Sequence, residues 1–421
     1  MLHMTREELM PGVHLTAVHT TKFKTGLIGF TFLDALMEET AAQNAMLPSL
    51  LLRGTQKYKD MEAISAALDE LYGGSIDPMV RKKGETQCIG FVGRFLEDTY
   101  APNVKMIESI ANLMGEILLH PAGRQFVPAY FEGERENLIR GIRAQINDKR
   151  QYSVTRLTEL MCEGEAYGID KLGREETAAQ ISMESLWTRY QTLLHENTLH
   201  LYYCGSAPMD RVREAFLYAL RDLPQTQRKS CPPCLIQTVD PNMVPRMFEE
   251  RMDVTQGKLT LGFRIAAHTD LAALLMFNAI YGGSTTSKLF MNVRERLSLC
   301  YFASSMIEKY KGILFVSSGV EFDQYEKAKD EILAQLDACR NGDITKEELD
   351  AARRSLVSSL KTMPDIQSRL EDYWLGQAVA NQSQTPEALA LAVEAVSIED
   401  VVAVANGIRT DSIYFLNGKE G

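Results

Sequence analysis

One cysteine pair is the first candidate in this chain for metal or redox chemistry. The motif Cys231-Pro-Pro-Cys234 has the spacing of a zinc-ligand pair or a redox pair. A zinc site needs two further ligands at suitable spacing, and no second pair is present. A redox pair stands at the start of a helix in a thioredoxin-like unit, which two prolines in a polar stretch do not provide. We interpret the motif as a turn, with zinc binding and redox chemistry as the alternatives.

The seven histidines do not have the spacing of a zinc site. Two histidines four residues apart on one helix face could bind one zinc ion, and no helical segment contains such a pair. His14 and His19 fall in one early strand, and His195 and His200 flank a turn into a later strand. Isolated histidines in such places are usually structural or exposed. We therefore predict no metal site in this chain.

The elements that must position any site can be read from the apolar pattern. Short runs rich in aromatic and β-branched residues predict strands at 26–33, 86–95, 199–205, 258–265, 301–307, 313–320 and 412–416. Helical periodicity covers residues 61–71, 104–119, 133–147, 270–280 and 345–361, and the last run opens with the capping box Thr345-x-x-Glu348. Strands and helices do not alternate strictly. The pattern predicts an α+β fold with mostly antiparallel sheets layered with helices.

A pair of similar segments in the two halves of the chain predicts two similar domains. The segment ISME, which contains Ser182, opens a helix before the strand LHLYYCG, and VSIE, which contains Ser397, opens a helix before SIYFLNG. Both helices have a capping serine and an acidic residue in the first turn. Chance similarity of two capped helices is the alternative. A stretch rich in proline and polar residues between the halves predicts a linker. The expected organisation is a domain over residues 1–224, a linker over 225–246 and a domain over 247–421.

Composition limits the classes of partner. The chain has 421 residues, of which 45% are hydrophobic, and a formal net charge of −11. This length suits more than one hydrophobic core, and the acidic balance argues against nucleic acid as the main partner. No run reaches the roughly 18 apolar residues that a membrane span needs. The first residues lack the apolar centre of a secretory signal, and the seven cysteines suit a reduced state. We expect a cytoplasmic protein with no membrane partner.

The segment IYGGSTTSKLFMNVRERLSLCYFAS has a distinctive order of residues. Gly282-Gly283 is followed by Ser-x-Leu-Phe, then by Arg294, and seven residues later by Tyr301. This order resembles the second-domain signature of the insulinase/pitrilysin-type metallopeptidases, the inverted zincins. The strand GLIGFTFL, the ending Leu-Leu-Arg-Gly-Thr and the stretch DELYGG resemble the family's first domain. The resemblance covers the whole chain and implies two homologous α+β domains that form half of a peptidase clamshell.

The position at which active relatives carry their zinc motif holds no ligands here. In those relatives, the helix before Lys/Arg-Gly-Thr carries His-x-x-Glu-His, whose histidines bind zinc and whose glutamate is the general base. The corresponding residues of this chain are Ala45, Pro48 and Ser49. Alanine cannot bind a metal, serine is a poor zinc ligand, and proline disturbs a mid-helix backbone. The third ligand of active relatives is a later glutamate, which aligns near Gly141. We expect Glu134 and Glu136, a turn or two earlier, to form a solvated face.

The resemblance implies roles for residues of the second domain. In active relatives, the arginine aligned with Arg294 holds a substrate carbonyl, and the tyrosine aligned with Tyr301 donates to the oxygen that becomes negative. The Gly282-Gly283 turn would let a substrate backbone approach closely. Without the resemblance, the same residues would be read as an exposed arginine in an Arg-Glu-Arg cluster and an aromatic residue at a strand start.

Some family members are heterodimers in which one chain carries His-x-x-Glu-His and the other carries only the Arg/Tyr pair. The resemblance therefore implies a noncatalytic, substrate-positioning subunit that hydrolyses nothing alone and holds no cofactor. A homologous catalytic partner would hold the zinc, and an extended peptide substrate would add to a sheet edge. The chain most resembles the bacterial noncatalytic partner associated with elongation factor P modification. The alternatives are a scaffolding protein, as in respiratory complexes, and a homodimer that captures peptides without cutting them.

Overall fold

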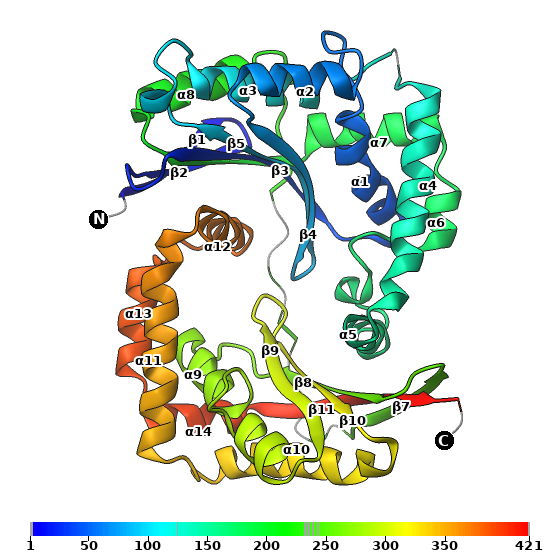
Figure 1. Ribbon diagram of the computed structural model, residues 1–421, viewed down its shortest axis with the longest axis vertical. Helices are drawn as coiled ribbons and strands as arrows, with labels where there is room; N and C mark the ends of the chain where they lie inside the picture. The colour runs from blue at the N-terminus through cyan, green and yellow to red at the C-terminus, as the bar shows by residue number, and fades with distance from the viewer. Residues whose placement is uncertain are drawn as a thin grey trace. The chain divides into compact units, whose positions relative to one another are not determined.

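The computed structural model describes residues 3–123, 125–230, 234, 236–237, 240, 242 and 244–419. The chain divides into two compact units, each with one β-sheet and layers of helices (Figure 1). The first unit consists of Met1–Arg143, Ile169–Pro233 and Pro364–Ser383, and the second of Ala144–Gly168, Cys234–Met363 and Gln384–Gly421. The units are therefore not contiguous halves. Residues 144–168, from the first half of the chain, belong to the second unit, and residues 364–383, from the second half, belong to the first unit.

The first unit is built on a six-stranded sheet with the order β1-β2-β6-β3-β5-β4. Its strands are β1 (His3–Met10), β2 (Val13–His19), β3 (Thr25–Ala35), β4 (Ser75–Lys83), β5 (Thr86–Leu96) and β6 (Thr198–Gly205). Its helices are α1 (Glu38–Leu51), α2 (Met61–Glu70), α3 (Met106–Leu119), α4 (Pro128–Ala144), α6 (Glu175–Ala179), α7 (Met183–Glu196), α8 (Met209–Ala219) and α12 (Gln367–Val379). Only β2 and β6 pair in parallel.

The second unit is built on a five-stranded sheet with the order β7-β11-β8-β10-β9. Its strands are β7 (Arg246–Met252), β8 (Gly257–Ile265), β9 (Cys300–Glu308), β10 (Ile313–Val320) and β11 (Ile408–Gly418). Its helices are α5 (Lys149–Met161), α9 (Leu271–Tyr281), the π-helix η4 (Leu289–Arg296), α10 (Tyr325–Arg340), α11 (Lys346–Thr362), α13 (Pro386–Ala395) and α14 (Ile398–Asn406). Only β7 and β11 pair in parallel.

The two sheets repeat one design. The order β2-β6-β3-β5-β4 corresponds to β7-β11-β8-β10-β9, with the single parallel pair at the same place in each. The strands β6 and β11 each follow a capped helix, in which Ser182 accepts from the Ser185 amide at 3.0 Å and Ser397 from the Asp400 amide at 3.1 Å. These caps satisfy amides that the first helical turn leaves unpaired. The α+β fold class with two related sheets is confirmed.

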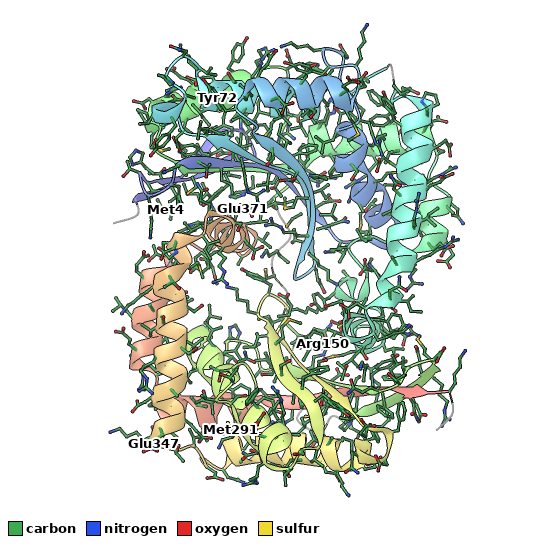
Figure 2. The ribbon with its side chains drawn as sticks, viewed as in Figure 1. Met4, Tyr72, Arg150, Met291, Glu347 and Glu371 are labelled. Atoms are coloured by element: carbon green, nitrogen blue, oxygen red, sulfur yellow. The ribbon has the colours of Figure 1, made fainter. Side chains whose placement is uncertain are left out.

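Several helices cover one face of each sheet (Figure 1). The other face is covered by α12 in the first unit and by α5 in the second, and each of these helices comes from the opposite half of the chain. In the second unit, Arg150 on α5 donates to the Ser304 hydroxyl at 2.9 Å and lies 4.2 Å from the centroid of the Phe302 ring. In the first unit, Glu371 on α12 accepts from Arg81 at 2.6 Å. Figure 2 labels Arg150 and Glu371 on these two helices. Because helices cover both faces, central strands such as GLIGFTFL are buried almost throughout and read as continuous apolar runs.

A buried histidine makes the first unit sensitive to pH. His200 on β6 is 2% exposed, and its Nε2 lies 3.0 Å from the Thr16 hydroxyl. Burial, with smaller contributions from the positive charges of Arg6 and His14, lowers the pKa of His200 to about 3. The unfolded chain binds a proton at this residue near pH 6.5, whereas the folded chain does not. The contribution of neutral His200 to the free energy of unfolding is therefore complete above about pH 6.5, and it decreases as the pH falls from there toward 3.

We expect the free energy of unfolding to fall by about 2 kcal/mol between pH 7 and pH 5 because of His200. This value follows from the difference between its pKa in the folded and in the unfolded chain. Urea unfolding at the two pH values measures the loss. His200→Asn should flatten this dependence even though it lowers stability at pH 7. The matched control is His268→Asn, because His268 is exposed and has a left-handed backbone that asparagine tolerates. Equal pH dependence in the wild type and His200→Asn would contradict the assignment.

Candidate functional site

The helix at the expected zinc position is intact but has no metal ligands. Ala45 and Pro48 are buried in α1, Ser49 is half-buried, and the helix continues through Pro48 to Leu51. These side chains do not fit a zinc ion, because none offers imidazole, thiolate or carboxylate. Across the part of the chain that the structure describes, no three His, Cys, Asp or Glu side chains are grouped so that they could hold a metal.

A buried polar network fixes α1 against the sheet of the first unit. The Asn44 side chain donates to Asp34 at 2.9 Å and to Gln87 at 2.8 Å, and it accepts from Arg189 at 2.8 Å. Arg189 also forms an ion pair with Asp34, and all four side chains are buried. Buried charges of this kind persist when they are paired and hydrogen-bonded. Side-chain hydrogen bonds therefore hold the helix in place beside Ala45.

The expected third-ligand region differs from the prediction at one residue. Gly141 is exposed with open space around its α-carbon, and Glu136 is exposed as expected. Glu134, however, is 7% exposed and accepts from Arg53 Nε at 2.5 Å, so its assignment to a solvated face was wrong. Glu134 lies one turn after the buried Phe131 on the inward face of α4, and the Arg53 guanidinium compensates its charge there.

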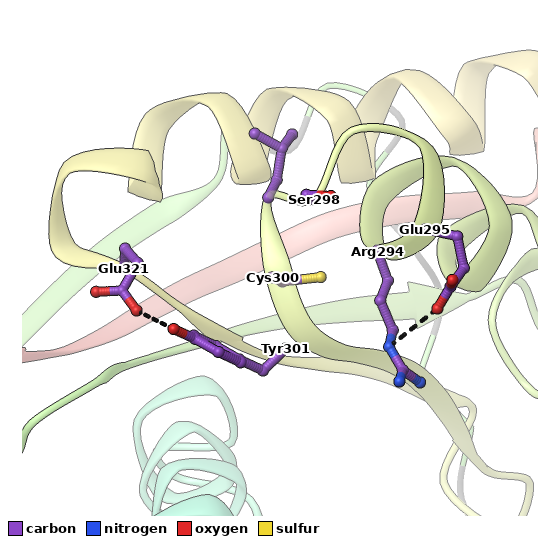
Figure 3. Close-up of a pocket in the computed structure, with 7 residues that line it drawn as sticks. Arg294, Glu295, Ser298, Cys300, Tyr301 and Glu321 are labelled. Atoms are coloured by element: carbon purple, nitrogen blue, oxygen red, sulfur yellow. Dashed lines mark hydrogen bonds and ion pairs between the residues drawn. The ribbon is translucent and has the colours of Figure 1, made fainter.

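Arg294 and Tyr301 line one pocket in the second unit. The pocket has a volume of about 380 Å³ and is formed where η4, the start of β9 and the end of β10 meet (Figure 3). Its lining residues are Arg294, Glu295, Ser298, Leu299, Cys300, Tyr301 and Glu321. In Figure 3 the Tyr301 side chain extends from β9 toward Glu321, and the Arg294 side chain extends from η4 beside Glu295. The structure thus brings together the two residues that the sequence pattern singled out.

The backbone between these two residues is irregular at three points. Arg294 lies in a π-helix, where the Leu297 amide bonds the Asn292 carbonyl at 3.1 Å, five residues back. Ser298 has a left-handed φ of 50°. Tyr301 is the extra residue of a bulge, because Cys300 pairs with Val320 while Phe302 pairs with Gly319. π-Helices, left-handed non-glycine residues and bulges cost regular hydrogen bonding and concentrate at functional sites. All three irregularities fall within or next to the segment that lines the pocket.

The hydroxyl of Tyr301 has a defined partner. It donates to Glu321 Oε1 at 2.6 Å, and the Tyr301 side chain is otherwise open to solvent, with 61% of the residue exposed. The hydrogen bond to Glu321 and the negative charge of that carboxylate raise the pKa of Tyr301 above its ordinary value. The phenol therefore stays protonated throughout the physiological range.

The guanidinium of Arg294 remains largely available. Its Nε lies 3.3 Å from Glu295 Oε1, and its central carbon lies 4.6 Å from the centroid of the Phe290 ring. The Arg294 side chain is 41% exposed. Because no hydrogen bond from either Nη atom to another described residue is found, the forked end of the guanidinium can donate to a ligand oxygen.

Gly282 and Gly283 lie outside the pocket lining. A β-carbon on Gly282 would lie 2.6 Å from the Ser305 hydroxyl and 2.7 Å from a Leu289 methyl group. A β-carbon on Gly283 would lie 2.5 Å from the Asn278 side chain. Glycine at 282 thus allows close packing against η4 and β9, and glycine at 283 allows the chain to pass close to Asn278 of α9. Their contact with a substrate backbone stays a prediction.

Sequence reasoning missed Glu321 as part of the site. Glu321 directly follows β10, and the antiparallel pairing of β10 with β9 places this end beside Tyr301. The two predicted strands at 301–307 and 313–320 contained this signal, because a hairpin brings the end of one strand to the start of the other. Cys300 also lines the pocket, and burial raises the pKa of its thiol. Cys231 of the cysteine motif lies outside the described residues.

Comparisons with known proteins identify the family of this chain. Residues 180–356 match the family model described as the peptidase M16 inactive domain. A *Bacillus subtilis* (strain 168) protein named probable inactive metalloprotease YmfF is 32% identical over 416 residues, which cover 97% of each chain. The chain belongs to the M16 peptidase family. The resemblance to inactive members of the insulinase/pitrilysin-type metallopeptidases is thereby confirmed.

Solved structures extend the comparison to the fold. A conserved protein from *Enterococcus faecalis* V583 has a TM-score of 0.90 and 27% identity, with 99% of each chain covered. A protease from *Helicobacter pylori* has a TM-score of 0.83 at 14% identity, with 99% of this chain and 100% of that chain covered. The whole M16 chain therefore has the fold of these proteins. Within its described residues, no helix has both the length and the apolar character that crossing a bilayer requires.

Proposed function

We propose that this M16 chain is a noncatalytic, substrate-positioning subunit of a heterodimeric zinc metallopeptidase. In this proposal, Arg294 and Tyr301 serve the zinc site of a homologous partner that carries His-x-x-Glu-His. The peptide substrate would add to a sheet edge, as extended peptides commonly do. The cytoplasmic location and the link to elongation factor P modification stay predictions.

One contrast within the chain carries this proposal. In α1 the three motif positions hold Ala45, Pro48 and Ser49, none of which is a histidine, cysteine or carboxylate. In the second unit, by contrast, Arg294 and Tyr301 line one pocket, and the backbone between them is irregular at three points. Strained backbone clusters at active sites and ligand clamps, and this favours a retained binding site over a scaffold alone.

The chemistry assigned to the chain follows from its donors. The Arg294 guanidinium presents several N–H groups in a rigid fork and would hold a peptide carbonyl. The Tyr301 hydroxyl would donate to the carbonyl oxygen as that oxygen gains negative charge. The partner would supply the metal and the attacking water. Neither donor of this chain needs to change its protonation state, because guanidinium and phenol both remain protonated near pH 7.

The direct test pairs the purified chain with a homologue that has an intact His-x-x-Glu-His, ideally the product of an adjacent gene. A panel of internally quenched peptides is incubated with this chain, with the homologue, and with an equimolar mixture. We expect zinc-dependent cleavage only by the mixture, together with a heterodimer in size-exclusion chromatography with light scattering. The control replaces the motif glutamate of the homologue with glutamine, which should abolish activity of the mixture.

Two results would count against the proposal. Zinc-dependent cleavage by this chain alone would contradict the noncatalytic assignment. Peptide binding by a homodimer of this chain, with no gain in cleavage when any motif-bearing homologue is added, would favour the alternative of a homodimeric peptide-binding protein.

A further inference from the structure

The contact between Tyr301 and Glu321 adds a feature that the proposed function does not contain. The two side chains come from the facing ends of β9 and β10, and their oxygen atoms are 2.6 Å apart (Figure 3). A distance this short is typical of a hydroxyl that donates to an ionised carboxylate. Among the described residues, Tyr301 is the only one found to donate a hydrogen bond to the carboxylate of Glu321.

This contact determines what the tyrosine can offer to a ligand. A phenol has one proton and can therefore donate one strong hydrogen bond. In the structure that proton is directed to Glu321, so the hydroxyl faces other groups only as an acceptor. A ligand carbonyl is also an acceptor and gains nothing from the hydroxyl in this state. The carbonyl must compete with a carboxylate, which is the stronger acceptor because it is charged.

We propose that Glu321 is a positioning residue that keeps the Tyr301 hydroxyl engaged, and that a substrate carbonyl must displace Glu321 before Tyr301 donates to it. The effect of Glu321 on peptide cleavage rests on the proposed function, because it acts through the same tyrosine. The hydrogen bond between Tyr301 and Glu321 lies within this chain and can be tested without a partner. Glu321 and Tyr301 are both exposed, so the exchange requires rotation of surface side chains and no rearrangement of the core.

The structural part is tested on the full-length single chain by NMR. Tyrosines are labelled with 13C at the ring carbon that bears the hydroxyl, and Tyr301→Phe assigns the Tyr301 signal. We expect this signal to titrate at higher pH in the wild type than in Glu321→Ala, with Glu321→Gln between them. The matched control is Asp323→Ala, which removes an exposed carboxylate two residues away and outside the pocket. A Tyr301 titration that is unchanged in Glu321→Ala overturns the proposal.

The consequence is tested in the heterodimer with the motif-bearing homologue. We expect Glu321→Ala to raise kcat/KM by about three- to tenfold, the effect of removing one competing exposed hydrogen bond. The gain should disappear in a Tyr301→Phe background, because the two side chains act on each other. A loss of activity in Glu321→Ala, or the same gain without the Tyr301 hydroxyl, would overturn the proposal. Inactivity of the wild-type mixture would defeat the proposed function, while the NMR titration would still decide whether Glu321 engages Tyr301.

Discussion

Replacing Arg294 by alanine or Tyr301 by phenylalanine should reduce kcat/KM of the heterodimer by about 10²- to 10³-fold, the usual effect of losing one donor to a developing oxyanion. The loss should appear mainly in kcat for Tyr301→Phe, because its hydroxyl would donate most strongly in the transition state. Arg294→Ala should also raise KM, because the guanidinium would hold the carbonyl in the ground state. Arg294→Lys should restore little, because an ammonium lacks the planar fork of donors.

Matched controls separate this effect from a general disturbance of the surface. Arg296→Ala removes an exposed arginine two residues away that does not line the pocket. Tyr218→Phe removes the hydroxyl of another exposed tyrosine, on α8 of the first unit. Both controls should retain nearly full activity, and all variants should bind the partner as the wild type does. If the Arg294 and Tyr301 variants support cleavage as well as the wild type, these two residues do not complete the site.

Replacing Glu165 by glutamine should lower the unfolding free energy of the second unit by about 3–5 kcal/mol, the usual cost of removing one partner from a buried ion pair. Glu165 forms ion pairs with Arg264 at 2.6 Å and with Lys311 at 2.7 Å. The Arg264 side chain is 7% exposed and that of Lys311 is 1% exposed. Asp411 also pairs with Arg264, at 2.9 Å, so Arg264 keeps one carboxylate partner in the variant. The glutamine would keep the shape and lose the charge.

The pKa of Glu165 makes the same prediction testable with pH. Burial alone would raise this pKa, but hydrogen bonds from Arg264 and Lys311 outweigh burial and lower it below the ordinary value. A lowered carboxyl pKa stabilises the fold above the unfolded value of about 4.5, and this contribution is lost as the pH falls through the folded pKa. The change in the free energy of unfolding would be measured by urea titration, with hydrogen exchange of the amides in β8 and β10 as the readout. The control is Glu163→Gln, an exposed glutamate two residues away. Equal stability of the two variants at pH 7 would contradict the prediction.

Much of the architecture could be predicted from the chain alone. Central strands such as β3, β8 and β10 are apolar runs at the predicted positions, because helices cover both sides of them. The capping box at Thr345 was predicted and is formed, with the Glu348 amide 3.1 Å from the threonine hydroxyl. Local chemistry determines both features, so a short window of residues is enough to recognise them. Three edge strands, β1, β4 and β7, were missed because each pairs on one side only and carries many polar residues.

The site was predicted in part for the same reason. The spacing of Arg294 and Tyr301 and the loss of ligands at the zinc helix are properties of short segments. The π-helix, the left-handed Ser298 and the bulge at Tyr301 depend on how η4 and β9 pack against their neighbours. The residue pattern of 288–296 does not by itself distinguish a π-helix from an ordinary α-helix. Glu321 joined the site only through strand pairing.

By itself, the sequence determined the α+β class, the central strands, the residue types at positions 45, 48 and 49, and the spacing of Arg294 and Tyr301. Only the tertiary structure decided that Glu134 is buried against Arg53, that Glu321 holds the Tyr301 hydroxyl, and which helix covers each sheet. The helices α5 and α12 each belong to the unit built mainly from the other half of the chain. An amphipathic pattern shows that a helix has an apolar face, but it does not say which apolar surface that face will cover. That choice depends on contacts between residues far apart in the chain, which a local pattern does not contain.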